Sequence, residues 1–215
     1  MSSINDGPQS VSPTDIDFAT AFDDICQTLQ QRVQSPDVQF ISENPYNSYP
    51  TRLDIGRIQQ VVTNFVINAV KYTSQGHIRV GWKPTSDPSL LGMRTVTSSD
   101  EKASEKNIHF PPLQEGAGGG ADGLLIYCED TGTGIPKDKQ ASIFERFVKL
   151  NEFVQGTGLG LSICKSIAER CGGHIGVESE GEGYGSTFWI WIPCPHTSTP
   201  IEQHQKSDSH ESAKL

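Results

Sequence analysis

Two asparagines and a lysine within residues 57–73 are the first side chains whose types and spacing indicate chemistry. The segment reads RIQQVVTNFVINAVKYT. If it is helical, one polar stripe contains Arg57, Gln60, Asn64, Asn68 and Lys71, because residues three and four apart are neighbours on a helix. Asparagine is a poor helix former, so two of them stacked within a helix need a reason. Amide oxygens ligate hard cations and an ammonium neutralises phosphate, so this face indicates a metal and phosphate site. An ordinary solvated face is the alternative.

A carboxylate follows the apolar run 124–128, where Asp130 begins the loop DTGTGIP. Gly132 and Gly134 would let the backbone approach a flat ligand closely. A carboxylate only accepts hydrogen bonds, so Asp130 suits an exocyclic amine such as that of adenine. The alternative is an ordinary Asp-Gly loop.

A second glycine-rich stretch, residues 156–161, reads GTGLGL and comes immediately before a predicted helix. Backbone N–H groups at a helix N-terminus can hold phosphate. The stretch is neither a Walker A loop nor a dinucleotide-binding fingerprint, since it lacks Gly-Lys-Ser/Thr and the preceding strand. Alone, such a turn is weak evidence for a phosphate site, and it becomes informative only through its position after the two other motifs in the chain.

The elements that must position these motifs follow from hydrophobic periodicity. We predict helices at 15–34, 55–72, 138–147 and 160–171, and strands at 38–41, 77–82, 124–129, 174–179 and 186–192. The helix 55–72, with Asp54 as its N-cap, carries an apolar stripe about 130° from the polar one. This stripe consists of Ile58, Val62, Phe65 and Ala69. The strand 77–82, with Ile78, Val80 and Trp82 on one face, is its expected partner.

Composition limits the domain organisation and the class of protein. With 215 residues and polar ends, we expect one domain at 14–193, a disordered segment or linker at 1–13, an exposed insertion at 84–123 and a disordered tail at 194–215. A net charge of -9 excludes a typical nucleic-acid surface. No apolar run is long enough for a membrane segment, and no signal peptide is recognisable. The five cysteines lack a C-x-x-C pair, which indicates a reducing cytoplasm and no cysteine metal site.

Five stretches resemble, in order, the N, G1, F, G2 and G3 boxes of the catalytic ATP-binding domain of bacterial sensor histidine kinases. They are residues 64–73 (NFVINAVKYT), 130–135 (DTGTGI), 144–147 (FERF), 156–161 (GTGLGL) and 185–188 (GSTF). The resemblance covers about residues 15–193. It implies the Bergerat ATP-binding fold, an α+β two-layer sandwich in which a mixed, mostly antiparallel sheet packs under three helices. ATP would lie beneath a mobile lid.

The resemblance also implies roles for individual residues. Asn64 and Lys71 would be catalytic, acting near the metal and on the phosphates, and Asn68 would ligate Mg²⁺. The residues that it implies for ATP binding are Asn68, Tyr72, Asp130, Gly132, Gly134, Ile135, Gly156, Gly158, Leu159, Gly160 and Thr187. Phe144 and Phe147 would anchor the lid at 149–155, or else serve as core residues.

The sequence departs from a complete kinase because it shows no dimerisation domain with a phosphoacceptor histidine. His210 precedes Glu211, as in such domains, but it lies in an aperiodic tail, and we interpret it as coincidence. The implied function is transfer of the ATP γ-phosphoryl group to a histidine supplied by such a domain, with a response regulator downstream. The alternatives are a nucleotide-responsive binding module without transfer activity and a serine kinase that antagonises sigma factors. We expect the chain in the cytoplasm, tethered to a membrane sensor if it is a fragment.

Overall fold

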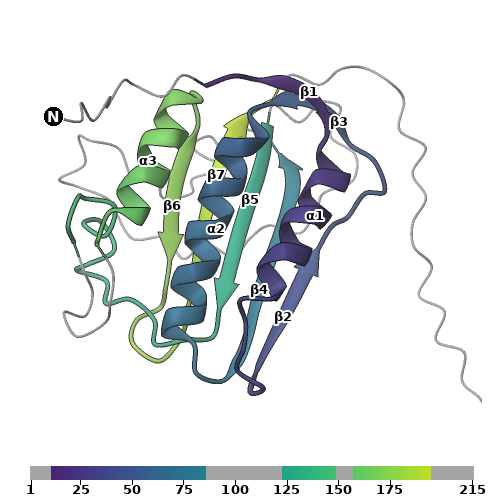
Figure 1. The fold of residues 1–215 in the computed structure, drawn as a ribbon. Coiled ribbons are helices and arrows are strands. Elements are labelled where there is room, and N and C mark those ends of the chain that lie inside the picture. Colours follow the sequence, from purple (N-terminus) through teal and green to yellow (C-terminus); the bar gives the residue numbers. More distant parts are fainter. Residues whose placement is uncertain (1–10, 86–122, 149–156, 195–215) are drawn as a thin grey trace, which may run out of the picture.

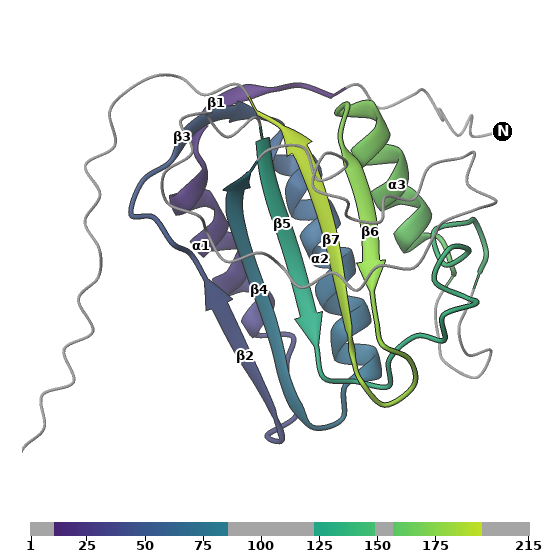
Figure 2. The same cartoon turned by 180° about the vertical axis from the view of Figure 1, so that it is seen from behind.

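A five-stranded sheet with three helices on one face forms the main body of the protein. The structure is a computed structural model that describes residues 11–85, 123–148 and 157–194. The helices are α1 (Phe18–Gln30), α2 (Ile55–Tyr72) and α3 (Gly160–Arg170). The strands are β1 (Thr14–Asp17), β2 (Val38–Glu43), β3 (Pro50–Leu53), β4 (Gly76–Thr85), β5 (Gly123–Asp130), β6 (His174–Glu178) and β7 (Ser186–Pro193). Figure 1 shows the helices in front of the sheet, and Figure 2 shows the sheet from its other face.

The sheet has the strand order β2-β4-β5-β7-β6. Only the β2–β4 pair is parallel, and the other three pairs are antiparallel. The predicted α+β sandwich with a mixed, mostly antiparallel sheet is therefore confirmed, as is the predicted hairpin of β6 and β7. A separate two-stranded ribbon joins β1 to β3.

The helix α2 has the predicted bounds and lies across the middle of the sheet (Figure 1). Asp54 caps it, because its carboxylate accepts a hydrogen bond from the backbone N–H of Arg57. All four residues of the predicted apolar stripe are buried. The facing side chains of β4, namely Ile78, Val80 and Trp82, are at most 2% exposed. The stripe and the strand therefore form the core together, as their patterns predict.

The prediction places the start of the first helix too early, because a short strand precedes that helix. Asp17 is the N-cap of α1, and its carboxylate accepts a hydrogen bond from the N–H of Thr20. Residues Thr14–Asp17 form β1, which pairs with β3 at Pro50–Leu53, and neither strand was predicted. The helical spacing of Ile16 and Phe18 with later apolar residues concealed this change of conformation.

Three further predictions are wrong. The first helix ends at Gln30 and not at residue 34. The segment 138–147 forms successive turns instead of a helix, held by backbone bonds such as that from Ser142 N–H to Lys139 O. The predicted insertion 84–123 is too wide, since β4 extends through Thr85 and β5 begins at Gly123. The rest of that insertion and most of the two predicted terminal segments, with His210, lie outside the described residues.

The cysteines behave as small apolar side chains. All five are free, four are buried and Cys171 is half-buried. Within the described ranges, no helix combines the length and the hydropathy that a bilayer crossing needs.

Candidate functional site

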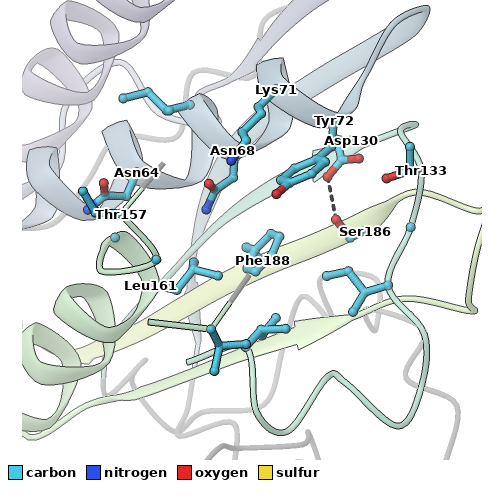
Figure 3. A pocket seen from close by; sticks show the side chains of 17 residues that line it. Asn64, Asn68, Lys71, Tyr72, Asp130, Thr133, Thr157, Leu161, Ser186 and Phe188 are labelled. Atoms are coloured by element: carbon cyan, nitrogen blue, oxygen red, sulfur yellow. Dashed lines mark hydrogen bonds between the residues drawn. The ribbon is translucent and has the colours of Figure 1, made fainter. Parts of the chain in front are cut away.

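A cavity of about 220 Å³ opens between α2, α3 and the ends of β5 and β7. It brings together parts of four of the five motif stretches, which are up to about 120 residues apart in the sequence. Asn64, Asn68, Lys71 and Tyr72 enter it from α2, and Asp130 enters from the end of β5 (Figure 3). The cavity therefore brings together residues that the resemblance assigns to one ATP site.

The polar stripe of α2 supplies one end of the cavity. Asn64, Asn68 and Lys71 all line it, one helical turn apart. The Lys71 ammonium lies 5.0 Å from the centre of the Tyr72 ring. Gln60 lies earlier on the same stripe but outside the lining, and its amide oxygen accepts a hydrogen bond from Arg57. Only the C-terminal part of the stripe is thus available to a ligand.

Asp130 lies at the other end of the cavity, where neighbouring residues of the protein donate hydrogen bonds to its carboxylate. The side chain is 5% exposed. Its carboxylate accepts hydrogen bonds from the Ser186 hydroxyl at 2.6 Å, the Gly132 N–H at 2.8 Å and the Thr73 hydroxyl at 3.5 Å. Burial raises the pKa of Asp130 above its ordinary value, although these three donors act in the opposite direction. Each carboxylate oxygen has two acceptor positions, so the group retains capacity for a ligand donor.

At this end of the cavity, β7 contributes Ser186 and Phe188 to the lining but not the predicted binding residue Thr187. Successive side chains of a strand point to opposite faces of the sheet, and on β7 the cavity is lined by Ser186 and Phe188. Thr187 lies between them and is not among the lining residues. The dashed line in Figure 3 marks the contact of Ser186 with Asp130. The alternation of the predicted strand 186–192 was the signal that could have identified Ser186.

The first glycine loop follows Asp130 and curves around the cavity. Gly134 and Ile135 line it, as does Thr133 between the two glycines. Gly132 is absent from the lining and acts through its N–H, which bonds Asp130. Gly134 has a φ of +70°, and a Cβ on it would overlap the carbonyl oxygen of Gly181. A glycine is therefore required here by both conformation and space.

The second glycine loop leads into α3. Thr157, Gly158 and Gly160 line the cavity, whereas Gly156 lies outside the described residues. Leu159 is the N-cap of α3 and is not a lining residue. Within the described residues no side chain caps this helix, so among them its first N–H groups are available to an anion. The loop thus places a helix N-terminus beside the asparagine stripe.

The two phenylalanines of the F box differ in their exposure to solvent. Phe144 is 1% exposed and its ring lies 6.3 Å from that of Phe188, so it is a core residue. Phe147 is 72% exposed and has a φ of +66°. The predicted lid 149–155 lies outside the described residues.

Several lining residues were not predicted as site residues. They are Ile67, Thr133, Ile143, Val148, Thr157, Leu161, Ser186 and Phe188. Most are apolar, and in a sequence an apolar residue that lines a cavity has the same pattern as one that packs in a core. A flat apolar ligand with an amine at one end and anionic groups at the other matches this distribution.

The residues present also fit a magnesium ion that takes only a few of its ligands from protein side chains. Asn64 and Asn68 offer amide oxygens, which are ligands that hard cations accept. Within the described part of the chain, no group of three or more His, Cys, Asp or Glu side chains could hold a metal. A magnesium ion here must therefore take most of its ligands from phosphate oxygens and water, as Mg²⁺ commonly does.

Comparison with protein families and curated proteins identifies related chains. Residues 53–196 match the family model described as "Histidine kinase-, DNA gyrase B-, and HSP90-like ATPase". The sensor kinase CckA of Brucella abortus is 30% identical over 206 residues, which is 96% of this chain and 19% of CckA. The chain thus spans about a fifth of the length of this relative.

Solved structures share the fold. The full-length ShkA structure in complex with AMPPNP has a TM-score of 0.66 at 23% identity and matches 91% of this chain and 34% of ShkA. The catalytic domain of the histidine kinase ThkA has a TM-score of 0.59 at 23% identity, and the match covers 85% of this chain and 97% of that domain. The fold described above is therefore that of a histidine kinase catalytic domain.

Proposed function

The chain belongs to the family of histidine kinase-, DNA gyrase B- and HSP90-like ATPases, and we propose that it is the ATP-binding catalytic domain of a sensor histidine kinase. The observation that carries this proposal is the arrangement of one cavity. A buried carboxylate stands at one end, and two carboxamides, a lysine and a helix N-terminus that no described side chain caps stand at the other. The domain that we propose spans residues 14–193.

We propose that Asp130 accepts a hydrogen bond from the adenine amine. Ser186, Gly132 and Thr73 already donate to this carboxylate and hold it in one orientation. Tyr72, Gly134 and Ile135 would contact the base or the ribose. Because a carboxylate only accepts hydrogen bonds, the site selects a base that presents a donor at this position.

The other end of the cavity would bind the triphosphate. Lys71 would neutralise phosphate charge, and the backbone N–H groups at Gly158, Leu159 and Gly160 would donate to phosphate oxygens. Asn68 would ligate Mg²⁺, with Asn64 beside it. Bound between protein and phosphates, Mg²⁺ would neutralise charge on the transferred group.

The reaction that we propose is transfer of the γ-phosphoryl group to a histidine imidazole. The contribution of this chain is positioning and charge neutralisation, since phosphoryl transfer needs little covalent chemistry from the protein. The partners are a dimerisation domain that carries the phosphoacceptor histidine and, downstream, a response regulator. A cytoplasmic location suits both partners.

Calorimetric titration of two variants tests the assignment of the two ends. Asn68→Ala should weaken binding of Mg-ATP far more than binding of magnesium-free ADP. Asp130→Ala should weaken both ligands alike, because both contain adenine. Equal losses for the two ligands in Asn68→Ala would contradict the metal role of Asn68.

The second candidate is a binding module that responds to nucleotide without transferring phosphate. A phosphoacceptor domain of a related kinase, incubated with this chain, Mg²⁺ and γ-labelled ATP, separates the two candidates. Label on the added domain supports the kinase. The intact polar stripe and glycine loops favour transfer activity over both this module and a serine kinase of the anti-sigma type.

A further inference from the structure

Cys164 lies on α3 directly against Asn64 of α2. The side-chain nitrogen of Asn64 donates a hydrogen bond to the Cys164 sulfur at 3.5 Å, although the two residues are 100 positions apart in the sequence. The cysteine is 0% exposed. Among the described residues, this thiol is the only hydrogen-bond partner of the Asn64 amide.

The other end of the same carboxamide faces a different position on α3. Gly160 precedes Cys164 by four residues and therefore lies on the same helix face. A Cβ on Gly160 would lie 3.2 Å from the Asn64 side-chain oxygen. The nitrogen thus faces the buried thiol, and the oxygen faces a glycine that lines the cavity.

We propose that Cys164 is a positioning residue for Asn64, which keeps the amide nitrogen out of the cavity and presents the amide oxygen to it. This inference rests on the proposed function of the site. The two ends of a carboxamide have opposite chemistry, because the oxygen accepts from water or ligates a cation while the nitrogen donates to anions. The orientation set by Cys164 therefore makes Asn64 a partner for magnesium or its water ligands.

The thiol is suited to this task because it is neutral. Burial raises the pKa of Cys164 to about 12, despite the hydrogen bond from Asn64, so the sulfur carries no charge at neutral pH. A neutral thiol is a weak acceptor and a weak donor, and in the structure its sulfur accepts from the amide nitrogen of Asn64. It does so without placing a competing anion near the phosphate end of the cavity.

Two substitutions separate hydrogen bonding from packing. Cys164→Val keeps an apolar side chain of similar size and removes the acceptor, whereas Cys164→Ser keeps an acceptor at the same place. Cys26→Val, at a cysteine of α1 that is 3% exposed, is the matched control for replacing a buried thiol. The readouts are kcat, the KM for ATP, the melting temperature and the NMR signals of the Asn64 side-chain amide.

Loss of one weak hydrogen bond predicts that Cys164→Val lowers kcat about 3- to 10-fold with little change in KM, and that it shifts the Asn64 amide signals. Cys164→Ser should retain both the rate and the signals, and Cys26→Val should leave kcat unchanged. An unshifted Asn64 signal in Cys164→Val would overturn the inference, whether or not kcat falls. If the unmodified chain transfers no phosphate, the proposed function fails, but the Asn64 signals still decide this inference.

Discussion

Ser186 and Thr187 are neighbours in the chain and lie on opposite faces of β7. Ser186 donates a 2.6 Å hydrogen bond to the carboxylate of Asp130, and Thr187 is absent from the cavity lining. Ser186→Ala should therefore weaken ADP binding about 3- to 10-fold, because Asp130 loses one of its supports. Thr187→Ala is the matched control and should bind ADP like the unmodified chain in calorimetric titration. A larger loss in Thr187→Ala than in Ser186→Ala would contradict the placement of the two side chains.

The raised pKa of Asp130 predicts how nucleotide binding depends on pH. Burial favours the neutral acid, so protonation removes the acceptor at a higher pH than for an ordinary aspartate. Affinity for ADP should fall as the pH is lowered from neutrality through this raised pKa. Titrations over a pH series should show the fall in the unmodified chain and not in Asp130→Asn.

The same shift predicts an opposite trend for stability. The folded-state pKa lies above the unfolded value, so the stability linked to this group is fully present below the unfolded pKa and is lost as the pH rises through the folded pKa. Without nucleotide, the free energy of unfolding of the unmodified chain should therefore rise relative to that of Asp130→Asn on acidification. Urea unfolding at several pH values measures the difference. A constant difference across the series would show that the pKa of Asp130 is unchanged by folding.

At the scale of elements, the loop after β5 depends on close contact with the β6–β7 turn. A Cβ at Gly134 would overlap Gly181 O, whereas Gly183, in the same turn, also has a positive φ but no atom within 4 Å of such a Cβ. Gly183→Ala should cost about 1 kcal/mol, because only the left-handed backbone is penalised. Gly134→Ala should cost clearly more and should also weaken ADP binding. Equal costs in urea unfolding would argue against the contact.

The N-cap of α2 leads to a second prediction about an element. One oxygen of Asp54 accepts from the N–H of Arg57 and the other accepts from the N–H of Ser12. Asp54→Ala should lower the free energy of unfolding by about 1 kcal/mol, as for other N-caps. Asp138→Ala, at an exposed aspartate in the turns after β5, is the control and should be close to neutral. If both variants unfold at the same urea concentration, Asp54 does not cap the helix in solution.

The elements that the sequence predicts well are those whose pattern is set by one buried face. The bounds of α2 and the hairpin of β6 and β7 follow from apolar periodicity and glycine turns. The strands β1 and β3 escaped prediction because each has four residues and owes its conformation to the other. The segment 138–147 was predicted as a helix although it forms turns. Ile143 and Phe144 are buried, as they would be in a helix, but the backbone hydrogen bonds of the segment follow the helical pattern only in part.

The residues of the candidate site also divide into those that the sequence predicts and those that it does not. Asn64, Asn68 and Asp130 were predictable because their chemistry is unusual for their positions. Ile67 and Leu161 were not, because an apolar residue that lines a cavity has the same sequence pattern as one that fills a core. The contact of Asn64 with Cys164 joins two helices that are distant in the chain, and local spacing does not encode it.

At the scale of the whole molecule, the chain forms one cavity, which we propose as an ATP site, with both polar and apolar lining residues. The three helices lie on one face of the sheet (Figure 1), and residues of α2 and α3 both line the cavity. In the function that we propose, the phosphoacceptor histidine belongs to a dimerisation domain. We therefore propose that this site transfers phosphate to a histidine presented to it.

The most direct test is phosphorylation of a separately made phosphoacceptor domain from a related histidine kinase. The chain, Mg²⁺ and γ-labelled ATP should place on that domain a label that acid removes and base does not. Asn68→Ala should abolish the label while the variant still binds magnesium-free ADP. Tight binding of Mg-ATP without any label, on a phosphoacceptor domain shown to be competent with its own kinase, would contradict the account and support a nucleotide-binding module.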